Sequence, residues 1–218
     1  MKAAFIFDLN GTMIDDMAYH IEGWFDILNT DLGAGLSYEQ VKGHMYGKNS
    51  ELLERVFGKD RFTEQEIHDL SMEKERRYQS AYRPHLRLVK GLADFLAKAK
   101  QHNIPMGIGS AAIPFNVDFV LDGLGIRDYF GAVVTASDVH ESKPHPETFL
   151  KAAELLGMEP KDCIVFEDAP KGVEAAAAAG MRCVVLTTMH STGEFGRYAN
   201  VQQFITDYTD PWLNTLFP

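Results

Sequence analysis

The sequence predicts an α/β protein in which a doubly wound parallel sheet carries an inserted helical domain. Five short runs are continuously apolar and do not alternate, which is typical of strands buried on both faces. Segments with helical spacing separate the last four of these runs, so strand and helix alternate as they do around a parallel sheet. One interval near the N-terminus holds helical patterns and no convincing strand.

The predicted strands and helices follow one another in a regular order. Apolar, β-branched runs predict five strands, and a last short strand is expected near the C-terminus; these segments are 3–7, 105–108, 132–135, 163–166, 183–186 and 200–205. The predicted helices between them cover 113–124, 146–156 and 171–179. The last of these has five consecutive alanines and stops at Gly180, a residue that commonly ends helices. The crossovers between parallel strands are expected to be right-handed.

The helical insert divides the chain into two domains. Within it, the segments 37–40 and 63–66 each fit the capping-box pattern at the start of a helix. We therefore expect a core domain made of residues 1–14 and 86–218, and an inserted domain of residues 15–85. Acidic residues outnumber basic ones in the insert, which disfavours a nucleic-acid-binding domain.

Composition narrows the class of protein. The chain has 218 residues, 45% of them hydrophobic and 24% charged, as in an ordinary globular protein. A formal net charge of −10 makes nucleic acid and anionic membranes poor partners. Cys163 and Cys183 each open an apolar run and are expected to be buried thiols, which suits a reducing compartment. No signal peptide or bilayer-length apolar stretch is evident, so we expect a cytoplasmic protein.

Polar side chains follow the predicted strands at the point where each strand ends. Asp8 comes after the first strand, Ser110 after the second, Lys143 after the third, and Glu167 with Asp168 after the fourth. In an open parallel sheet, ligands bind beyond the carboxyl ends of the strands. Three carboxylates, a hydroxyl and an ammonium group are therefore expected to converge at one edge of the sheet.

Such a cluster of carboxylates needs a cation, and Mg²⁺ fits best. Magnesium binds few protein carboxylates, keeps several waters and shares its coordination shell with phosphate oxygens. Asp8 and Asp168 could each supply one oxygen, the backbone carbonyl near Asn10 another, and Glu167 could hold a bound water.

The neighbouring residues would suit a phosphate group. Ser110, together with backbone N–H groups that follow it from Ala111 onward, could hold phosphate oxygens near the start of the next helix. Lys143 would supply a point charge. Asp8 could then attack phosphorus, since aspartyl phosphates are established covalent intermediates.

Four short segments carry the polar residues named above: Phe7-Asp8-Leu9-Asn10-Gly11-Thr12, Gly109-Ser110, Ser142-Lys143-Pro144 and Phe166-Glu167-Asp168. In this order they resemble the motifs of the haloacid dehalogenase superfamily, and in particular those of its β-phosphoglucomutase-like phosphatases. The resemblance implies a Rossmann-like core with a helical cap and Mg²⁺-dependent phosphoryl transfer through aspartate. It makes Asp8 the nucleophile and a metal ligand, Asp168 and the Asn10 carbonyl further ligands, Glu167 a support for the metal, and Ser110, Ala111 and Lys143 the phosphate-binding groups. Its candidate cap contacts to substrate are His20, Lys42, Lys48 and Lys74.

Asn10 departs from the pattern of the family. Most relatives have a second aspartate at this position, which protonates the leaving oxygen and later deprotonates water. An amide cannot exchange protons near neutral pH, and loss of a general acid–base group typically costs about 10²–10⁴-fold in rate. Four explanations stay open: an engineered substitution, a natural branch that uses another acid or a good leaving group, a non-catalytic binder, or slow deamidation of Asn10-Gly11. In the natural branch, His20 is the candidate substitute acid.

Three functions follow from this sequence. The first is a Mg²⁺-dependent phosphatase that acts on a small phosphorylated metabolite, such as a sugar phosphate, and that works as a monomer. The second is a phosphomutase of the β-phosphoglucomutase type, against which Asn10 weighs more heavily because both sugar hydroxyls need proton transfer. The third is a catalytically impaired protein that binds a phosphorylated metabolite.

Overall fold

The computed structural model describes residues 3–218 and contains one six-stranded parallel sheet in the order β3-β2-β1-β4-β5-β6. The strands are β1 (Ala4–Phe7), β2 (Met106–Gly109), β3 (Ala132–Val134), β4 (Cys163–Glu167), β5 (Arg182–Leu186) and β6 (Val201–Ile205). The prediction of a doubly wound α/β fold is therefore confirmed. Strands β2 and β3 lie on one side of β1, and β4, β5 and β6 lie on the other. The strand order therefore switches sides at β1, and ligands bind at such a switch point in folds of this kind.

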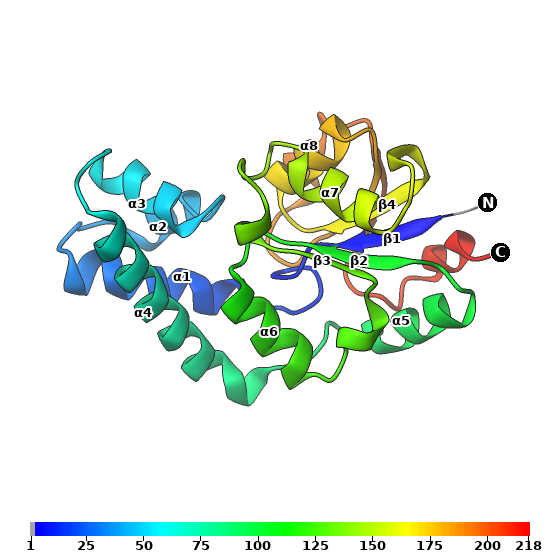
Figure 1. Cartoon of the computed structure of the whole chain (residues 1–218), viewed down its shortest axis with the longest axis horizontal. Coiled ribbons are helices and arrows are strands. Elements are labelled where there is room, and N and C mark those ends of the chain that lie inside the picture. Colours follow the sequence, from blue (N-terminus) through cyan, green and yellow to red (C-terminus); the bar gives the residue numbers. More distant parts are fainter. Residues whose placement is uncertain (1–2) are drawn as a thin grey trace. The chain divides into compact units, whose positions relative to one another are not determined.

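Helices cover both faces of the sheet (Figure 1). Those of the sheet-bearing part are α5 (Leu92–Gln101), α6 (Pro114–Gly123), α7 (Glu147–Leu155) and α8 (Pro170–Ala178). Short 3₁₀ turns lie at Arg127–Tyr129, Ala136–Asp138, Pro160–Asp162, Thr192–Phe195 and Pro211–Leu216. Helix α5 is not among the predicted helices, although Leu92, Phe95, Leu96 and Ala99 are buried at helical spacing.

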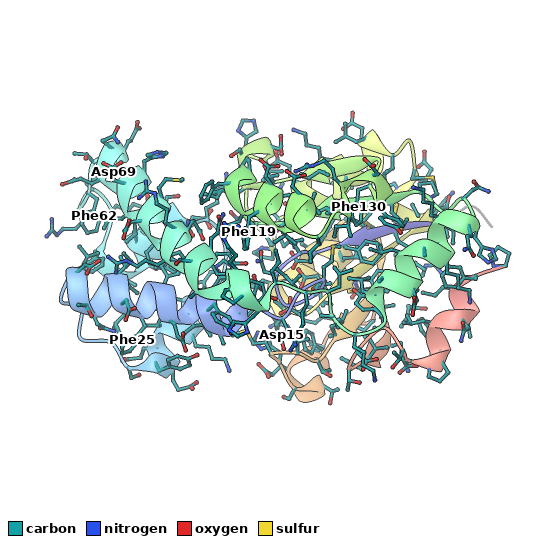
Figure 2. The ribbon with its side chains drawn as sticks, turned by 90° about the horizontal axis from the view of Figure 1, so that it is seen from below. Asp15, Phe25, Phe62, Asp69, Phe119 and Phe130 are labelled. Atoms are coloured by element: carbon teal, nitrogen blue, oxygen red, sulfur yellow. The ribbon has the colours of Figure 1, made fainter. Side chains whose placement is uncertain are left out.

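The two faces of β1 pack against different layers. Ala4 and Ile6 belong to a hydrophobic cluster that includes Phe149 of α7 and Val173 of α8. Alternate residues point the other way, as strand geometry requires. Phe5 stacks on Phe95 of α5 with a ring-centroid distance of 5.4 Å, and Phe7 packs edge-on against Phe130 at 6.1 Å. Figure 2 labels Phe130. The first strand is thereby buried on both sides, which fixes the residues that follow it.

The helical insert forms a separate compact unit. By internal contacts the chain divides into one unit made of residues up to Asp15 with Arg87–Pro218, the core unit, and another of Asp16–Leu86, the helical unit. Both boundaries of the helical unit lie one residue later in the chain than the expected limits of 15 and 85. The helical unit contains α1 (Met17–Phe25), a π-helical turn (Asp26–Asp31), α2 (Tyr38–Gly43), α3 (Asn49–Phe57), α4 (Glu64–Tyr82) and a 3₁₀ turn (Arg83–His85).

Both predicted capping boxes are present in the helical unit. The Ser37 hydroxyl accepts from the Gln40 backbone N–H at the start of α2, and the Thr63 hydroxyl accepts from that of Glu66 at the start of α4. The Gln40 and Glu66 side chains accept in turn from the backbone N–H groups of Ser37 and Thr63, so side chains satisfy four backbone donors at the helix starts.

Over residues 3–218, every helix is too short or too polar to cross a bilayer.

Candidate active site

The loop that follows β1 places Asp8 at the carboxyl edge of the sheet. The Asp8 backbone N–H donates to the Phe166 carbonyl at 2.9 Å, which extends the β1–β4 ladder by one residue. The chain then turns, with Gly11 at a φ of +76°, a backbone region that glycine adopts without strain. Asn10 is half-buried in this turn and forms an isolated bridge with Ile14.

Lys143 joins two of the predicted carboxylates. Its Nζ atom donates to Asp8 Oδ1 at 2.6 Å and to Glu167 Oε1 at 2.8 Å. Burial alone would favour loss of the proton, but the charges of Asp8 and Glu167 outweigh it and raise the pKa of Lys143. The ammonium group therefore stays charged at neutral pH, 4.5 Å from the centroid of the Phe149 ring.

Glu167 is held at the N-terminus of α8. Its Oε2 atom accepts from the backbone N–H groups of Asp168 and Ala169, both at 2.7 Å. A side chain at Gly172 would place its Cβ 1.6 Å from Glu167 Oε1, so glycine at 172 leaves room for the carboxylate. These bonds fix Glu167 as a partner of Lys143 and of the helix end.

Asp168 lies against the loop after β1. Thr12 Oγ1 donates to Asp168 Oδ1 at 3.3 Å, and a Cβ on Gly11 would lie 2.1 Å from Asp168 Oδ2. Burial, and then the nearby charges of Glu167 and Asp8, raise the pKa of Asp168 well above its usual range. Burial and the charges of Asp8 and Asp168 likewise raise the pKa of Tyr208, which keeps this phenol neutral.

The donor set fits a hard divalent cation. Three carboxylates with one ammonium group leave an excess of negative charge, which adds to burial in raising the pKa of Asp168. Among residues 3–218, no three histidine, cysteine, aspartate or glutamate side chains could hold a metal ion by themselves. Magnesium needs only one or two carboxylates, because water and substrate phosphate complete its shell. Asp8 and Asp168 supply that number.

Ser110 lies next to the same edge, after β2. Its backbone N–H donates to the Val134 carbonyl, and its hydroxyl accepts from the Ala112 N–H at 3.1 Å. The hydroxyl thus shapes the turn that holds Ala111 and leads into α6. Since Phe7 is in register with Ile108, the residues after β1 and β2 share the sheet edge.

The cap residues predicted from the resemblance lie in the helical unit. His20 and Lys74 meet in its interior, where Lys74 Nζ lies 2.6 Å from His20 Nδ1. The other ring nitrogen, His20 Nε2, lies 3.2 Å from Asp16 Oδ2. Lys42 lies in the last turn of α2, and Lys48 directly precedes α3. Both side chains are half-buried.

Comparison with known proteins gives the family of this fold and site. A family model described as haloacid dehalogenase-like hydrolase matches residues 2–180. The chain is 33% identical over 183 residues to the fructose-1-phosphate phosphatase YqaB of Escherichia coli, covering 84% of this chain and 95% of that protein. It is also 33% identical over 192 residues to the β-phosphoglucomutase of Bacillus subtilis, covering 84% and 82%. The crystal structure of β-phosphoglucomutase from Clostridium difficile superimposes with a TM-score of 0.85 at 28% identity, covering 99% and 96%.

The chain therefore belongs to the haloacid dehalogenase-like hydrolases. Within them it is a β-phosphoglucomutase-like enzyme of the phosphatase and phosphomutase group.

Several polar residues around the site are not among the predicted site residues. Thr12 belongs to the first motif, and its hydroxyl donates to Asp168 Oδ1. Thr188 Oγ1 donates to the Gly11 carbonyl at 2.6 Å and the Tyr208 hydroxyl donates to the Thr12 carbonyl at 3.3 Å. Thr188 follows β5, so the rule that selected Asp8 and Ser110 could have selected it. No pattern in the sequence points to Tyr208.

Proposed function

We propose that this enzyme is a Mg²⁺-dependent phosphatase of small phosphorylated metabolites, sugar phosphates among them, with Asp8 as the nucleophile. The observation that carries the proposal is the Asp8 carboxylate at the sheet edge, bonded to Lys143 and close enough to Asp168 to raise the pKa of that residue. An ionised carboxylate beside a permanently charged ammonium group is suited to attack phosphorus.

The site residues of the core unit have distinct roles in this proposal. Asp8 and Asp168 would hold the metal together with the Asn10 backbone carbonyl, and the bound ion would offset charge on the phosphoryl oxygens. Asp8 forms the new bond to phosphorus as the bond to the leaving oxygen breaks. Lys143 stabilises the charge on the equatorial oxygens, and the turn of Ser110 and Ala111 offers donors to them. Water then breaks the aspartyl phosphate and restores the Asp8 carboxylate, while Glu167 keeps Lys143 in place.

Asn10 limits which phosphates react well. The leaving oxygen departs with an electron pair, and an amide at position 10 cannot protonate it. Substrates whose leaving groups are weakly basic, such as acyl or aryl phosphates, need this proton least. Among sugar phosphates, those with the more acidic hydroxyl should react faster.

A phosphomutase is the second candidate, favoured by the 33% identity to the Bacillus subtilis β-phosphoglucomutase. An intramolecular transfer between two sugar hydroxyls needs a proton to leave one hydroxyl and another to reach the second. The amide of Asn10 can do neither, so we place hydrolysis first.

A single assay separates these functions. Phosphate release and isomerised product are measured with Mg²⁺ across sugar phosphates, acyl phosphates, nucleotides and pyrophosphate, with intact mass recorded before and after storage. Phosphate release supports the phosphatase, and isomerised product supports the mutase. Phosphate binding without turnover, also in Asn10→Asp, indicates a binding protein. Activity that grows on storage together with a mass change at Asn10 indicates deamidation.

A further inference from the structure

Two hydroxyl groups, from the segments that follow β5 and β6, donate hydrogen bonds to the loop after β1. Thr188 lies two residues beyond β5, and its Oγ1 donates to the Gly11 carbonyl at 2.6 Å. Tyr208 lies three residues beyond β6, and its hydroxyl donates to the Thr12 carbonyl at 3.3 Å. Both bonds lie within the core unit, and both span more than 170 residues of sequence.

The same loop has further backbone attachments on either side of these bonds. The Leu9 carbonyl accepts from the N–H groups of Met13 and Ile14, at 2.8 and 3.3 Å. The Met13 carbonyl accepts from the Val89 N–H at 2.8 Å. Carbonyls at positions 9, 11, 12 and 13 thus have identified donors, so the loop path is set by atoms outside the loop as well as within it.

The position of this loop determines where two catalytic carboxylates lie. Asp8 begins the loop, and Gly11 packs so closely on Asp168 that a Cβ would come within 2.1 Å of Oδ2. A shift of the Gly11 backbone would therefore move the surface on which Asp168 rests. Misplacement of reacting groups by about 1 Å can cost about 10²-fold in rate.

Tyr208 is itself held firmly. Its backbone N–H donates to the Lys90 carbonyl at 2.9 Å, and its ring lies among Phe7, Phe95 and Phe166. A Cβ on Gly91 would lie 2.8 Å from the Tyr208 carbonyl carbon, so the two segments are in close contact. The hydroxyl is thus presented to Thr12 from a rigid, buried support.

We propose that Thr188 and Tyr208 are positioning residues that fix the Asp8–Ile14 loop and, through Gly11, the geometry of Asp8 and Asp168. This inference rests on the proposed phosphatase function. Neither hydroxyl needs to touch substrate; each acts by holding a backbone carbonyl of the loop.

Thr188→Val tests the stronger bond, because valine keeps the shape of threonine and removes the donor. We expect kcat for p-nitrophenyl phosphate to fall by roughly 10-fold to 10²-fold at saturating Mg²⁺, with a higher Mg²⁺ requirement and little change in substrate KM. Thr188→Ser restores the hydroxyl and should restore kcat. Loss of kcat with no rescue by serine, or wild-type kcat in Thr188→Val, overturns the proposal.

Thr187→Val is the matched control. Thr187 is adjacent and half-buried, and its hydroxyl donates to the Ile205 carbonyl of the sheet at 3.3 Å rather than to the loop. A purely structural role for these threonines predicts similar losses of thermal stability and of kcat in the two valine variants. The positioning role predicts similar thermal stability but a loss of kcat in Thr188→Val alone.

Tyr208→Phe tests the weaker bond while keeping the ring in its aromatic cluster. Since the bond is longer, we expect a smaller loss of kcat, about 3-fold to 10-fold, with substrate KM unchanged. Wild-type kcat in this variant removes Tyr208 from the proposal.

A second readout separates failure of this inference from failure of the proposed function. Mn²⁺ binding is titrated by electron paramagnetic resonance in the wild type and in Thr188→Val, Thr188→Ser and Thr187→Val, without substrate. If the wild type hydrolyses no phosphate ester but Thr188→Val alone weakens Mn²⁺ binding, the positioning role stands and the phosphatase does not. If the wild type is an active phosphatase and all four proteins bind Mn²⁺ and turn over alike, the function stands and the positioning role falls.

Discussion

Each unit contains a buried cluster of carboxylates near one lysine, and the two clusters differ in how their negative charge is compensated. In the helical unit, Lys74 donates to Glu75 at 3.0 Å, and Asn49 donates to the other Glu75 oxygen at 2.8 Å. Asp16 there accepts from the Tyr78 hydroxyl and faces the His20 ring nitrogen. Glu75 therefore has a neutral donor in addition to the ammonium group, and Asp16 has a neutral donor in the Tyr78 hydroxyl.

The cluster of the core unit has three carboxylates around one ammonium group, one carboxylate more than the helical unit. Lys143 serves both Asp8 and Glu167, and the donor identified on Asp168 is the Thr12 hydroxyl at a long 3.3 Å. The raised pKa of Asp168 shows that its ionised form is poorly compensated. This difference supports the proposal that the core cluster receives a cation and a phosphate, whereas the hydrogen bonds of the other network join α1 and α4.

The largest expected effect tests the chemistry of the core cluster. Asp8→Asn keeps the shape of the side chain but removes the nucleophile, so phosphate release should fall by about 10⁴-fold or more. The fold should persist, because asparagine can still accept from Lys143. Steady-state kinetics with p-nitrophenyl phosphate and circular dichroism check both points. Substantial turnover in this variant would exclude Asp8 as the nucleophile.

The next effect tests the network of the helical unit. Lys74→Met removes the ammonium group that pairs with the buried Glu75 carboxylate at 3.0 Å, so the free energy of unfolding should fall by about 3–5 kcal/mol. The control Lys42→Met changes a half-buried lysine on α2 and should cost under about 0.5 kcal/mol. Urea denaturation measures both. Equal stability of the two variants would contradict the role of Lys74 as the charge that this network needs.

A third prediction concerns Asn10, the uncharged member of the catalytic loop. Asn10→Asp supplies a general acid, so phosphate release should rise by about 10²-fold for substrates with strongly basic leaving groups and less for aryl phosphates. A plot of log kcat/KM against the leaving-group pKa should therefore be steep for the wild type and flatter for the variant. Parallel plots would mean that another group already protonates the leaving oxygen.

Much of the fold followed from the apolar runs, because strands buried on both faces need continuous hydrophobic sequence. The convergence of Asp8, Lys143, Glu167 and Asp168 followed from one topological rule about the ends of parallel strands. The contacts of Thr188 and Tyr208 did not follow, since a hydroxyl that meets a distant backbone carbonyl leaves no periodic or compositional trace. The same is true of Asp16, whose burial among α1 and α4 residues depends on tertiary packing alone.

The smallest expected effect separates the two clusters by pH. The pKa of Asp168 is raised in the folded state, so its contribution to stability is present below the unfolded pKa and is lost as pH rises toward the raised value. In EDTA, Asp168→Asn should therefore remove part of the loss of stability above about pH 4, and above the raised pKa it should stabilise the metal-free protein by about 1 kcal/mol. With Mg²⁺ the wild type should be the more stable of the two, because it gains binding energy that Asp168→Asn lacks.

Asp16→Asn, in the helical unit, should destabilise the protein with or without Mg²⁺, since it replaces the carboxylate oxygen that contacts both Tyr78 and His20. Thermal unfolding of the wild type, Asp168→Asn and Asp16→Asn across pH, with EDTA and with Mg²⁺, measures these differences. If Asp168→Asn is less stable than the wild type in EDTA above the raised pKa, the core cluster does not carry uncompensated charge.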